Sequence, residues 1–478
     1  MTSAIVLGGG MAGMLAASVL ARHATVTVVE SDRFPDSPRP RKGLPQGHHS
    51  HMLMGGGAQA LESLLPGVTD TLYARGAKRR VMGSDILTLS SEGWSLRHDS
   101  DAFMIACSRD LLDHVVREQV LSDPAVTVLE AARATGFTGD DRRVTGVRVE
   151  QDGGAERTLG ADLVVDATGR RSRTPEWLAA LGVPAVPEQI VDSGLAYASR
   201  LFQAPDGVDD DFPAVLVQPE SGTDRPGRGG TVCLIEDGRW IVTLIGTRGG
   251  EPPTDESGFT AFPGAMRDPV LGELFSRATP LGEIRPHRGT ANRRRSYEKT
   301  PMPDGLAVIG DAVASLNPVY AHGMSVAAKS AVALRAELER TGGVRPGLAA
   351  RYQKRAAKET DLAWTMASTQ DLNYPQVRTE GVRRTAAPGG LAKRFGDRLA
   401  RTALSEPTVA RGLFDVYTLA APASRALTPA GLLTVLRGPR KAPLTTAEAL
   451  AQFPALQAVL DATPAHGTPA HGTTAGTR

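Results

Sequence analysis

Two hydrophobic periods follow each other within the first thirty residues of the chain. Residues 4–8 form an apolar run that ends in glycine, which predicts a short buried strand. The large apolar side chains of residues 11–22 recur at helical spacing, and residues 25–30 are rich in β-branched side chains, which favour strands. A strand, a tight turn, a helix and a second strand within this length match one βαβ unit.

The remaining pattern predicts an α/β framework that is interrupted by a strand-rich stretch. Residues 195–247 alternate short apolar runs with Gly and Pro, which favours a mainly antiparallel sheet. Further helices are expected at residues 58–65, 110–121 and 324–338, and further strands at residues 126–130, 144–150, 163–167 and 306–310.

We therefore expect an α/β fold with four parts. The C-terminal tail, residues 463–478, repeats Thr-Pro-Ala-His-Gly and has too little apolar content to pack, so this tail is expected to be disordered. The parts are a three-layer Rossmann-like nucleotide-binding domain (1–75, 105–190 and 300–345), an inserted substrate-binding domain with a mainly antiparallel sheet (76–104 and 191–299), a C-terminal helical region (346–462) and a tail (463–478).

The composition excludes several classes of protein. The chain has 478 residues, with 54 Lys and Arg against 52 Asp and Glu and a net charge of +2. So small a net charge gives no general attraction for nucleic acid, and no such partner is expected. Cys107 and Cys233 make neither a disulfide framework nor a zinc knuckle, so a cytoplasmic location is expected. No apolar run reaches the roughly eighteen residues that a membrane-spanning helix needs.

Three local clusters have simple interpretations. His48, His49 and His51 have no cysteine or carboxylate at ligand spacing, so we expect no metal and interpret them as a polar loop beside a cofactor. The run at 293–295 is three arginines without an aromatic platform, and is interpreted as a solvated strand end. The three glycines at 55–57 form either a flexible turn or a close approach to a ligand.

A glycine pattern separates the first strand from the first helix. Gly8 permits a tight turn, Gly10 lets a pyrophosphate approach the backbone, and Gly13 lets the helix pack on the strand. The N–H groups at the start of that helix would then face the phosphates. Glu30, at the end of the second strand, can accept hydrogen bonds from an adenosine ribose. The combination predicts a bound dinucleotide.

A second group of residues lies near the other end of the expected nucleotide-binding domain. The strand at 306–310 delivers Asp311 to its C-terminal end, where ligands gather in an open α/β sheet. Asn317-Pro318 follows, and Gly323 then opens a helix whose N–H groups can hold an electron-rich ring edge. The two groups together predict a long cofactor that spans both ends.

These motifs are similar to the FAD-binding motifs of class A flavoprotein monooxygenases. The resemblance implies that Glu30 binds the adenosine ribose, that Asp311 binds the ribityl chain and that the turn after Pro318 faces the isoalloxazine. Arg109 matches the arginine that this family places near the pyrophosphate and the ribityl chain. The cofactor-binding residues expected on this basis are Gly8, Gly10, Met11, Ala12, Gly13, Glu30, Arg41, Lys42, Arg109, Asp311, Pro318, Gly323 and Met324.

The same resemblance implies NAD(P)H as reductant, acting directly or through a flavin reductase. The chain has no second GxGxxG turn for a nicotinamide nucleotide. It also carries Asp166-Ala167-Thr168-Gly169 where the family often has an Asp-Gly pair. How the reductant binds is therefore open.

A narrower resemblance extends from about residue 3 to residue 375. The chain looks like the flavin epoxidases of polyether-ionophore biosynthesis, of the lasalocid and monensin type. This implies epoxidation, through a flavin C4a-hydroperoxide made from O2, of a linear polyene polyketide or another long apolar molecule, free or bound to a carrier protein. The cofactor does the difficult chemistry, so no catalytic side chain is assigned. The resemblance rests on residues 41–46, 49–51, 65–67, 104–109, 236–240, 246–253 and 317–325.

Other functions stay open beside epoxidation. A FAD-dependent hydroxylase of an aromatic or polyketide natural product would use the same cofactor, and a prenyl-chain reductase would share a long apolar pocket. A dinucleotide-binding module without catalysis is a further alternative. A flavin-dependent halogenase is not favoured, because its Trp-x-Trp-x-Ile-Pro segment does not occur around Trp94, Trp177, Trp240 or Trp364.

Overall fold

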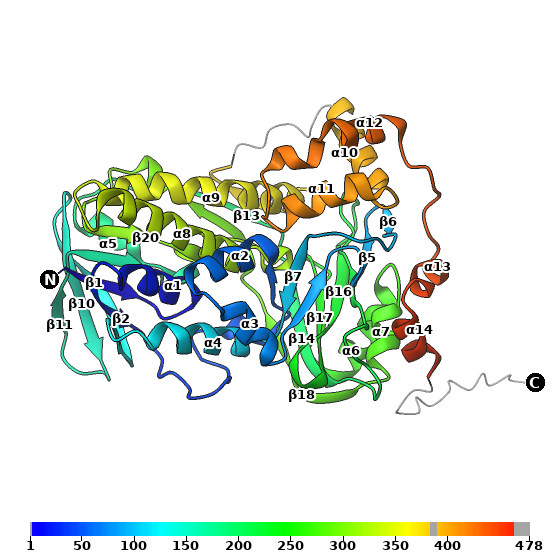
Figure 1. The fold of residues 1–478 in the computed structure, drawn as a ribbon, viewed down its shortest axis with the longest axis horizontal. Helices are drawn as coiled ribbons and strands as arrows, with labels where there is room; N and C mark the ends of the chain where they lie inside the picture. The colour runs from blue at the N-terminus through cyan, green and yellow to red at the C-terminus, as the bar shows by residue number, and fades with distance from the viewer. Residues whose placement is uncertain (1, 383–389, 463–478) are drawn as a thin grey trace, which may run out of the picture.

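A parallel five-stranded sheet forms one end of the protein, at the left of Figure 1. The computed structural model describes residues 2–382 and 390–462, so the tail expected at 463–478 lies outside this part. The strands predicted at residues 4–8, 25–30, 126–130, 163–167 and 306–310 are present in this sheet. In spatial order they are β20 (Leu306–Val308), β12 (Leu163–Asp166), β1 (Ser3–Leu7), β2 (Thr25–Val29) and β8 (Val126–Leu129).

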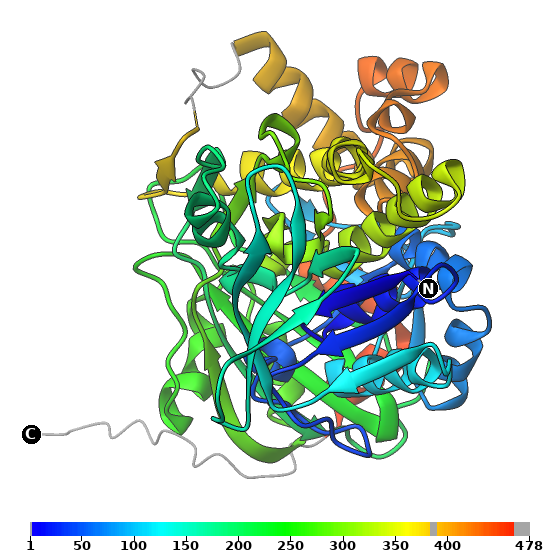
Figure 2. The ribbon, with the colours of Figure 1, turned by 90° about the vertical axis from the view of Figure 1, so that its left-hand side faces the viewer.

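Two layers cover this sheet (Figures 1 and 2). Ala4 and Val6 of β1 pack with helices on one face, whereas Ile5 and Leu7 pack with a strand meander on the other. The predicted three-layer Rossmann-like fold is thereby confirmed. The helices are α1 (Met11–Leu20), α2 (Gly55–Leu64), α3 (Val68–Ala74), α4 (Arg109–Leu121), α8 (Gly323–Thr341) and α9 (Leu348–Asp371), and the opposite layer holds β9 (Ala132–Gly139), β10 (Val144–Gln151), β11 (Arg157–Gly160) and α5 (Thr174–Ala180).

A seven-stranded sheet lies at the other end of the protein (Figure 1). Its spatial order is β18 (Thr279–His287), β14 (Ala196–Gln203), β17 (Arg239–Gly246), β16 (Arg228–Leu234), β15 (Ala214–Val217), β5 (Ile86–Ser90) and β6 (Gly93–Trp94). Only β5 and β15 pair in parallel, so the predicted antiparallel character is confirmed. Its outer face packs against α6 (Glu256–Ala261), α7 (Val270–Phe275), α13 (Thr446–Ala451) and α14 (Pro454–Asp461).

Two smaller sheets and three helices complete the chain. β22 was not predicted; it lies in the region expected to be helical and pairs with β13. The first small sheet has the spatial order β3 (Met52–Met54), β7 (Phe103–Ala106), β4 (Lys78–Val81). The second has the order β21 (Ala314–Ser315), β19 (Asn292–Arg295), β13 (Glu188–Asp192), β22 (Arg378–Glu380). The helices are α10 (Gly390–Ala403), α11 (Pro407–Tyr417) and α12 (Pro429–Arg437).

Short 3₁₀ turns connect several of these elements, and some of them carry predicted site residues. They are η1 (Pro45–His48), η2 (Gly169–Arg171), η3 (Glu236–Gly238), η4 (Phe262–Ala265), η5 (Tyr297–Lys299), η6 (Gly310–Ala312), η7 (Pro318–Tyr320) and η8 (Ala423–Leu427). The boundaries of the expected domains stay predictions. Within the described ranges, no helix combines the length and the apolar character that crossing a bilayer requires.

One of the two interpretations of residues 55–57 is wrong, and so is the expectation for Arg295. The glycines at 55–57 are not a flexible turn, because they form the first turn of α2, while their approach to a ligand stays a prediction. A Cβ atom on Gly56 would collide with the carbonyl oxygen of Leu419, and one on Gly57 would collide with Ser325 of α8. Arg295, expected at a solvated strand end, is 7% exposed and lies 3.0 Å from the carboxylate of Glu188.

The Gly56 contact predicts a large cost for one added methyl group. Gly56→Ala would push α2 away from the backbone at Leu419, and overpacking of this kind costs about 1–3 kcal/mol. Urea unfolding of the cofactor-free protein measures it. Gly264→Ala is the matched control, because a Cβ there meets nothing within 4 Å, and we expect its stability to be unchanged or slightly raised. Equal stability of the two variants would contradict the close approach.

Candidate functional site

Glycines at the start of α1 bring backbone segments too close together for side chains. A Cβ atom on Gly8 would lie 2.8 Å from the carbonyl oxygen of Ala167, and Gly8 has a φ of +92°. A Cβ atom on Gly13 would collide with the carbonyl of Gly8. One on Gly10 would meet no atom within 4 Å, so the space expected for a pyrophosphate is open.

The end of β20 meets the starts of α1 and α8. Gly310 has a φ of +63°, and a Cβ atom on it would lie 2.7 Å from the Cβ of Ala12 in α1. A Cβ atom on Gly323, the first residue of α8, would lie 3.5 Å from Oδ1 of Asp311. The two sequence motifs, far apart in the chain, are therefore neighbours in space.

Both of these helices start without a side-chain cap. Gly10 and His322 are the N-cap residues of α1 and α8, and neither helix has an acidic residue in its first turn. Some other helices, such as α2 and α9, also lack a side-chain cap, whereas Ser108 caps α4 and Thr445 caps α13. Because N–H groups at a helix start need acceptors and favour negative charge, both starts suit an anionic or electron-rich ligand.

Buried arginines and carboxylates line the space beside α1. Glu30 accepts a hydrogen bond from the backbone N–H of Gly9 at 2.7 Å. Arg41 lies 3.4 Å from Glu30 and 3.0 Å from Asp113, and Arg109 lies 3.9 Å from Asp113. The Nε atoms of Arg41 and Arg109 are buried and have no hydrogen-bond partner among the described residues. A phosphate oxygen is an acceptor that such donors match.

The carboxyl group of Asp311 lies within the field of two arginines. Burial raises the pKa of Asp311, and the positive charges of Arg170 and Arg109 partly offset this rise. Arg170 itself is fixed, because it donates to the carbonyl oxygens of Ala291 at 2.6 Å and Leu316 at 3.3 Å. Arg109 and Arg170 therefore both lie near enough to Asp311 for their charges to act on its carboxyl group.

The other expected cofactor-binding residues differ in what they present. Met11 and Met324 have buried side chains in the core between α1 and α8, so only their backbones are available to a ligand. Pro318 and Lys42 are exposed. No hydrogen bond or ion pair joins Lys42 to the group in the part of the chain that the structure describes.

A buried carboxylate fixes the turn that precedes α8. Asp371, at the end of α9, accepts hydrogen bonds from Asn292 Nδ2 at 2.7 Å, Asn317 Nδ2 at 2.9 Å and the Tyr320 hydroxyl at 2.6 Å. Burial raises the pKa of Asp371 to about 6, although these hydrogen bonds oppose the rise. Because Asn317 and Tyr320 lie on either side of Pro318 in the chain, their hydrogen bonds to Asp371 fix the position of the turn.

A polar row lies on the inner face of the seven-stranded sheet. Tyr197 of β14 donates to Oδ1 of Asn317 at 3.4 Å, which joins this face to the turn. The hydroxyl of Ser199 lies 2.7 Å from both Nδ1 of His49 and Oγ1 of Thr243. Burial lowers the pKa of His49 to about 3, so its imidazole is neutral at physiological pH. The described residues contain no cluster of three or more side chains suited to a metal.

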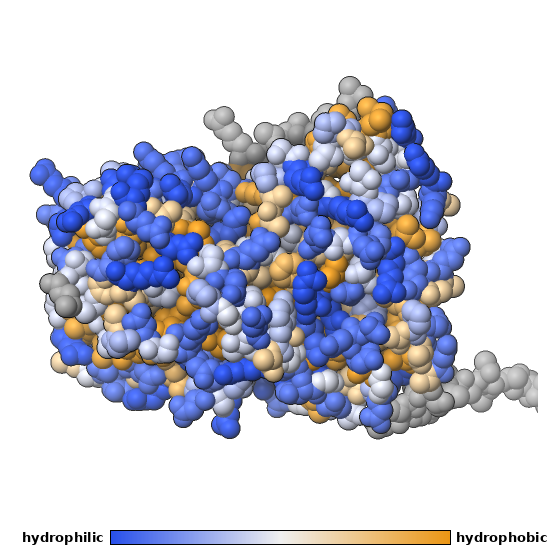
Figure 3. Space-filling model, viewed as in Figure 1, coloured by the Kyte–Doolittle hydropathy of each residue, from blue (hydrophilic) through white to orange (hydrophobic). Residues whose placement is uncertain are grey.

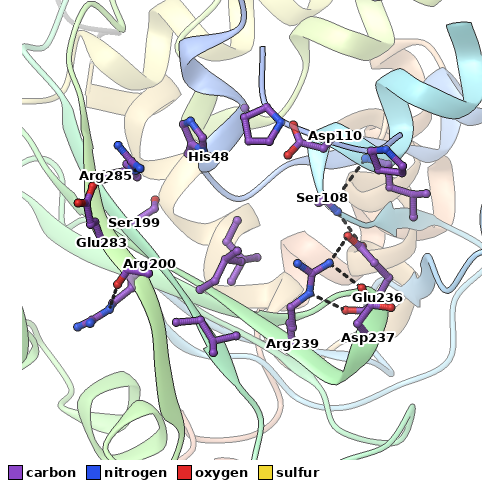
Figure 4. Close-up of a pocket in the computed structure, with 18 of the residues that line it drawn as sticks. His48, Ser108, Asp110, Ser199, Arg200, Glu236, Asp237, Arg239, Glu283 and Arg285 are labelled. Atoms are coloured by element: carbon purple, nitrogen blue, oxygen red, sulfur yellow. Dashed lines mark hydrogen bonds and ion pairs between the residues drawn. The ribbon is translucent and has the colours of Figure 1, made fainter. Parts of the chain in front are cut away.

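A cavity of about 840 Å³ opens on the same sheet face (Figure 4). Its apolar lining includes Leu201, Ile241 and Leu281 from the sheet and Leu111 from α4. In Figure 4, Glu236, Asp237 and Arg239 are joined on one side of the cavity, opposite a second charged group. The charged residues of the lining are Arg75, Asp110, Arg200, Glu236, Asp237, Arg239, Glu283 and Arg285.

Asp110 is a titratable group of this cavity. Burial and the nearby carboxylates of Asp113 and Glu236 raise the pKa of Asp110 to about 6, against the opposing effect of Arg109 and Arg239. A carboxyl group that titrates near neutrality inside a cavity is suited to proton transfer.

Sequence reasoning missed several of these residues. Asp110 and Arg170 directly follow the predicted Arg109 and the Asp166–Gly169 motif, so proximity in the chain was the available signal. No signal in the sequence pointed to Asp371, because it lies in a stretch that was predicted only as helical. Its role is visible only when α9 packs behind the turn at Asn317.

The residues present fit FAD. The open space at Gly10 and the unpartnered nitrogens of Arg41 and Arg109 match a pyrophosphate. Asp311 beside the uncapped start of α8 matches a hydroxylated chain that leads to a ring system with an electron-rich edge. Comparison with known proteins agrees with this fit.

A sequence model described as an FAD binding domain matches residues 1–361. Protein Rv3254 of Mycobacterium tuberculosis (strain ATCC 25618 / H37Rv) is 32% identical over 431 residues, which cover 87% of this chain and 89% of that protein.

Solved structures share the fold at low identity. The flavin-dependent brominase Bmp2 has a TM-score of 0.66 at 14% identity, with 91% of this chain and 98% of that chain covered. The oxygenase of 2-methyl-3-hydroxypyridine-5-carboxylic acid has a TM-score of 0.59 at 17% identity, with 78% of this chain and 91% of that chain covered. The Diels-Alderase PyrE3 has a TM-score of 0.58 at 18% identity, with 88% of this chain and 80% of that chain covered. Because these likenesses concern the fold alone, the expectation against halogenation stays a prediction. The chain belongs to the family that this FAD-binding domain defines.

Proposed function

We propose that this protein is an FAD-dependent monooxygenase that epoxidises olefins of a long polyketide polyene. The observation that carries the proposal is the meeting of two uncapped helix starts with Asp311, next to a sheet face that bears a cavity. FAD, when bound and reduced, supplies the activation of O2. NAD(P)H is the proposed electron source, directly or through a flavin reductase. The choice of a polyene rests on the resemblance to polyether epoxidases described above.

Each end of the cofactor has proposed partners in this chain. Gly10 and the first turn of α1 hold the pyrophosphate, Glu30 binds the adenosine ribose, and the side chains of Arg41 and Arg109 approach the phosphates. Asp311 binds the ribityl chain, and the start of α8 faces the isoalloxazine. Asp371 acts only through Asn317 and Tyr320, so it is a positioning residue rather than a catalytic one.

The cavity supports a long substrate with a polar end. Its volume of about 840 Å³ lies within the range of ligand pockets in general. Leu201, Ile241 and Leu281 would contact the apolar chain. Charged side chains such as Arg239 and Arg285 would hold the polar end of a polyketide, free or attached to a carrier. Asp110 would accept or release a proton in the cavity.

A second candidate is the hydroxylation of an aromatic or polyketide product. One observation favours it: the hydroxyls of Ser199 and Thr243 lie beside the neutral imidazole of His49 on the sheet face. A polar row of this kind can orient a substrate hydroxyl by hydrogen bonds, which a plain olefin does not need.

Isotopically labelled O2 distinguishes these reactions. The FAD-loaded protein is incubated with NADPH, a flavin reductase and a triene surrogate, and mass spectrometry follows the product. We expect one labelled oxygen atom per reacted double bond, with that double bond lost. Retention of every double bond with a C–H bond replaced by C–OH would support the hydroxylase. A gain of two hydrogens without label would indicate a reductase and contradict both.

Gly10→Ala tests the proposed pyrophosphate position. The new methyl group meets open space in the protein alone, so the thermal midpoint of the cofactor-free chain should stay the same. It would occupy the space of the phosphates, and we expect the dissociation constant of FAD, measured by flavin fluorescence, to rise at least tenfold. Asp311→Ala should weaken FAD binding similarly from the other end. Normal flavin absorbance in both purified variants would refute the assigned orientation.

The buried carboxyl of Asp371 predicts a specific pH dependence of stability. Its pKa is raised from 3.8 to about 6, so the unfolded chain loses this proton at lower pH than the folded protein does. The contribution of Asp371 to the free energy of unfolding therefore falls by roughly 2–3 kcal/mol as pH rises from about 4 to about 6. Urea unfolding at pH 4 and pH 7, compared with Asp371→Asn, isolates this change because other groups cancel. A parallel pH dependence of the two proteins would show that Asp371 ionises normally.

A further inference from the structure

The exposed large apolar side chains of the described residues gather in one place. They are Leu427, Leu432, Leu433 and Leu436, which are 46%, 39%, 49% and 62% exposed. No other large apolar side chain that the structure describes is exposed. We refer to these four residues as the leucine patch. Single exposed leucines need no explanation, whereas exposed apolar side chains that lie together often belong to an interaction site.

A fixed helix presents the leucine patch. In α12, Leu432, Leu433 and Leu436 share one side, while Gly431 and Val435 are buried on the other. Thr428 caps the start of α12, and Arg398 of α10 donates to the carbonyl oxygens of Val435 and Leu436 at its end. Figure 3 shows hydrophobic atoms at the top right, over the position of α12 in Figure 1.

Basic side chains without partners follow the leucine patch in the chain. Arg437, Arg440 and Lys441 are exposed, and no hydrogen bond or ion pair to another described residue holds them. The segment 390–441 contains nine Lys and Arg against three Asp and Glu, although the whole chain has a net charge of only +2. Positive charge is therefore concentrated on the part of the protein that bears the patch.

We propose that the leucine patch docks this protein on an anionic lipid surface. Leucines that insert at the boundary of headgroups and acyl chains, next to basic side chains that attract anionic headgroups, are the two contributions to interfacial binding. Four partly exposed leucines offer only a few hundred Å², which is below the roughly 800 Å² per partner of a stable dimer. Two copies of a strongly basic segment would also repel each other, so a second copy is disfavoured.

The docked orientation brings the lipid surface within one helix of the site. α12 packs on α11, and Phe414 and Tyr417 of α11 contact the core cluster that contains Ile241, which lines the cavity. The carbonyl oxygen of Tyr417 also lies 2.9 Å from Nε2 of His322, the N-cap residue of α8. The proposal itself does not depend on the proposed reaction, because it rests on the surface alone.

Vesicle sedimentation of the full-length, FAD-loaded protein tests the docking. We expect binding to vesicles of equal phosphatidylglycerol and phosphatidylcholine at low salt, and little binding to phosphatidylcholine alone. Raising the salt concentration should weaken the binding. Leu433→Ser with Leu436→Ser, both exposed, should reduce the partition constant at least tenfold, and Arg440→Glu with Lys441→Glu should do the same. Flavin content and the thermal midpoint confirm that each variant is folded.

A charge-matched control separates this surface from the general charge. Arg142→Glu with Arg143→Glu changes the net charge equally in the turn between β9 and β10, and it should leave vesicle binding unchanged. Equal loss in this control would overturn the proposal, as would wild-type binding that is unaffected by the leucine substitutions. A dimer seen by light scattering without lipid, and abolished by those substitutions, would assign the patch to a second copy instead.

Discussion

The site depends on the close approach of backbone segments at the carboxyl edge of the parallel sheet. Gly8 lies against Ala167, Gly13 against Gly8, and Gly310 against Ala12, and in each case a side chain would need space that another atom occupies. These contacts draw the starts of α1 and α8 to the end of β20. Since both starts lack side-chain caps, the packing that builds the fold also creates two groups of N–H donors without local acceptors.

The seven-stranded sheet supplies the other side of the site through one alternating set of side chains. Phe202 and Trp240 of β14 and β17 point to the outer helices, whereas Tyr197, Ser199 and Thr243 lie on the inner face. The inner face is joined to the turn at Asn317, and Asp371 fixes that turn from α9. Hydrogen bonds thus link the inner face of this sheet to the turn before α8 and to α9.

The sequence predicted those features that local patterns encode. The βαβ unit, the strand before Asp311 and the antiparallel sheet each follow from periodicity and from the placement of glycine, and the structure has all of them. The packing role of the glycines at 55–57 and the role of Asp371 could not be predicted, for a common reason: they come from contacts with Leu419 and Asn317, which are distant in the chain. The charged lining of the cavity is likewise assembled from several separate segments, and no spacing along the chain announces it.

The strand order of the parallel sheet has a consequence for synthesis on the ribosome. β12 ends at Asp166, but its neighbour β20 begins only at Leu306, and the start of α8 lies later still. At the usual 5–20 residues per second, the nascent chain waits roughly 7–30 s with that edge of β12 unpaired. An unpaired parallel edge is prone to wrong association. The start of α8 is synthesised only after this interval, so the site between α1 and α8 is completed late in the synthesis of the chain.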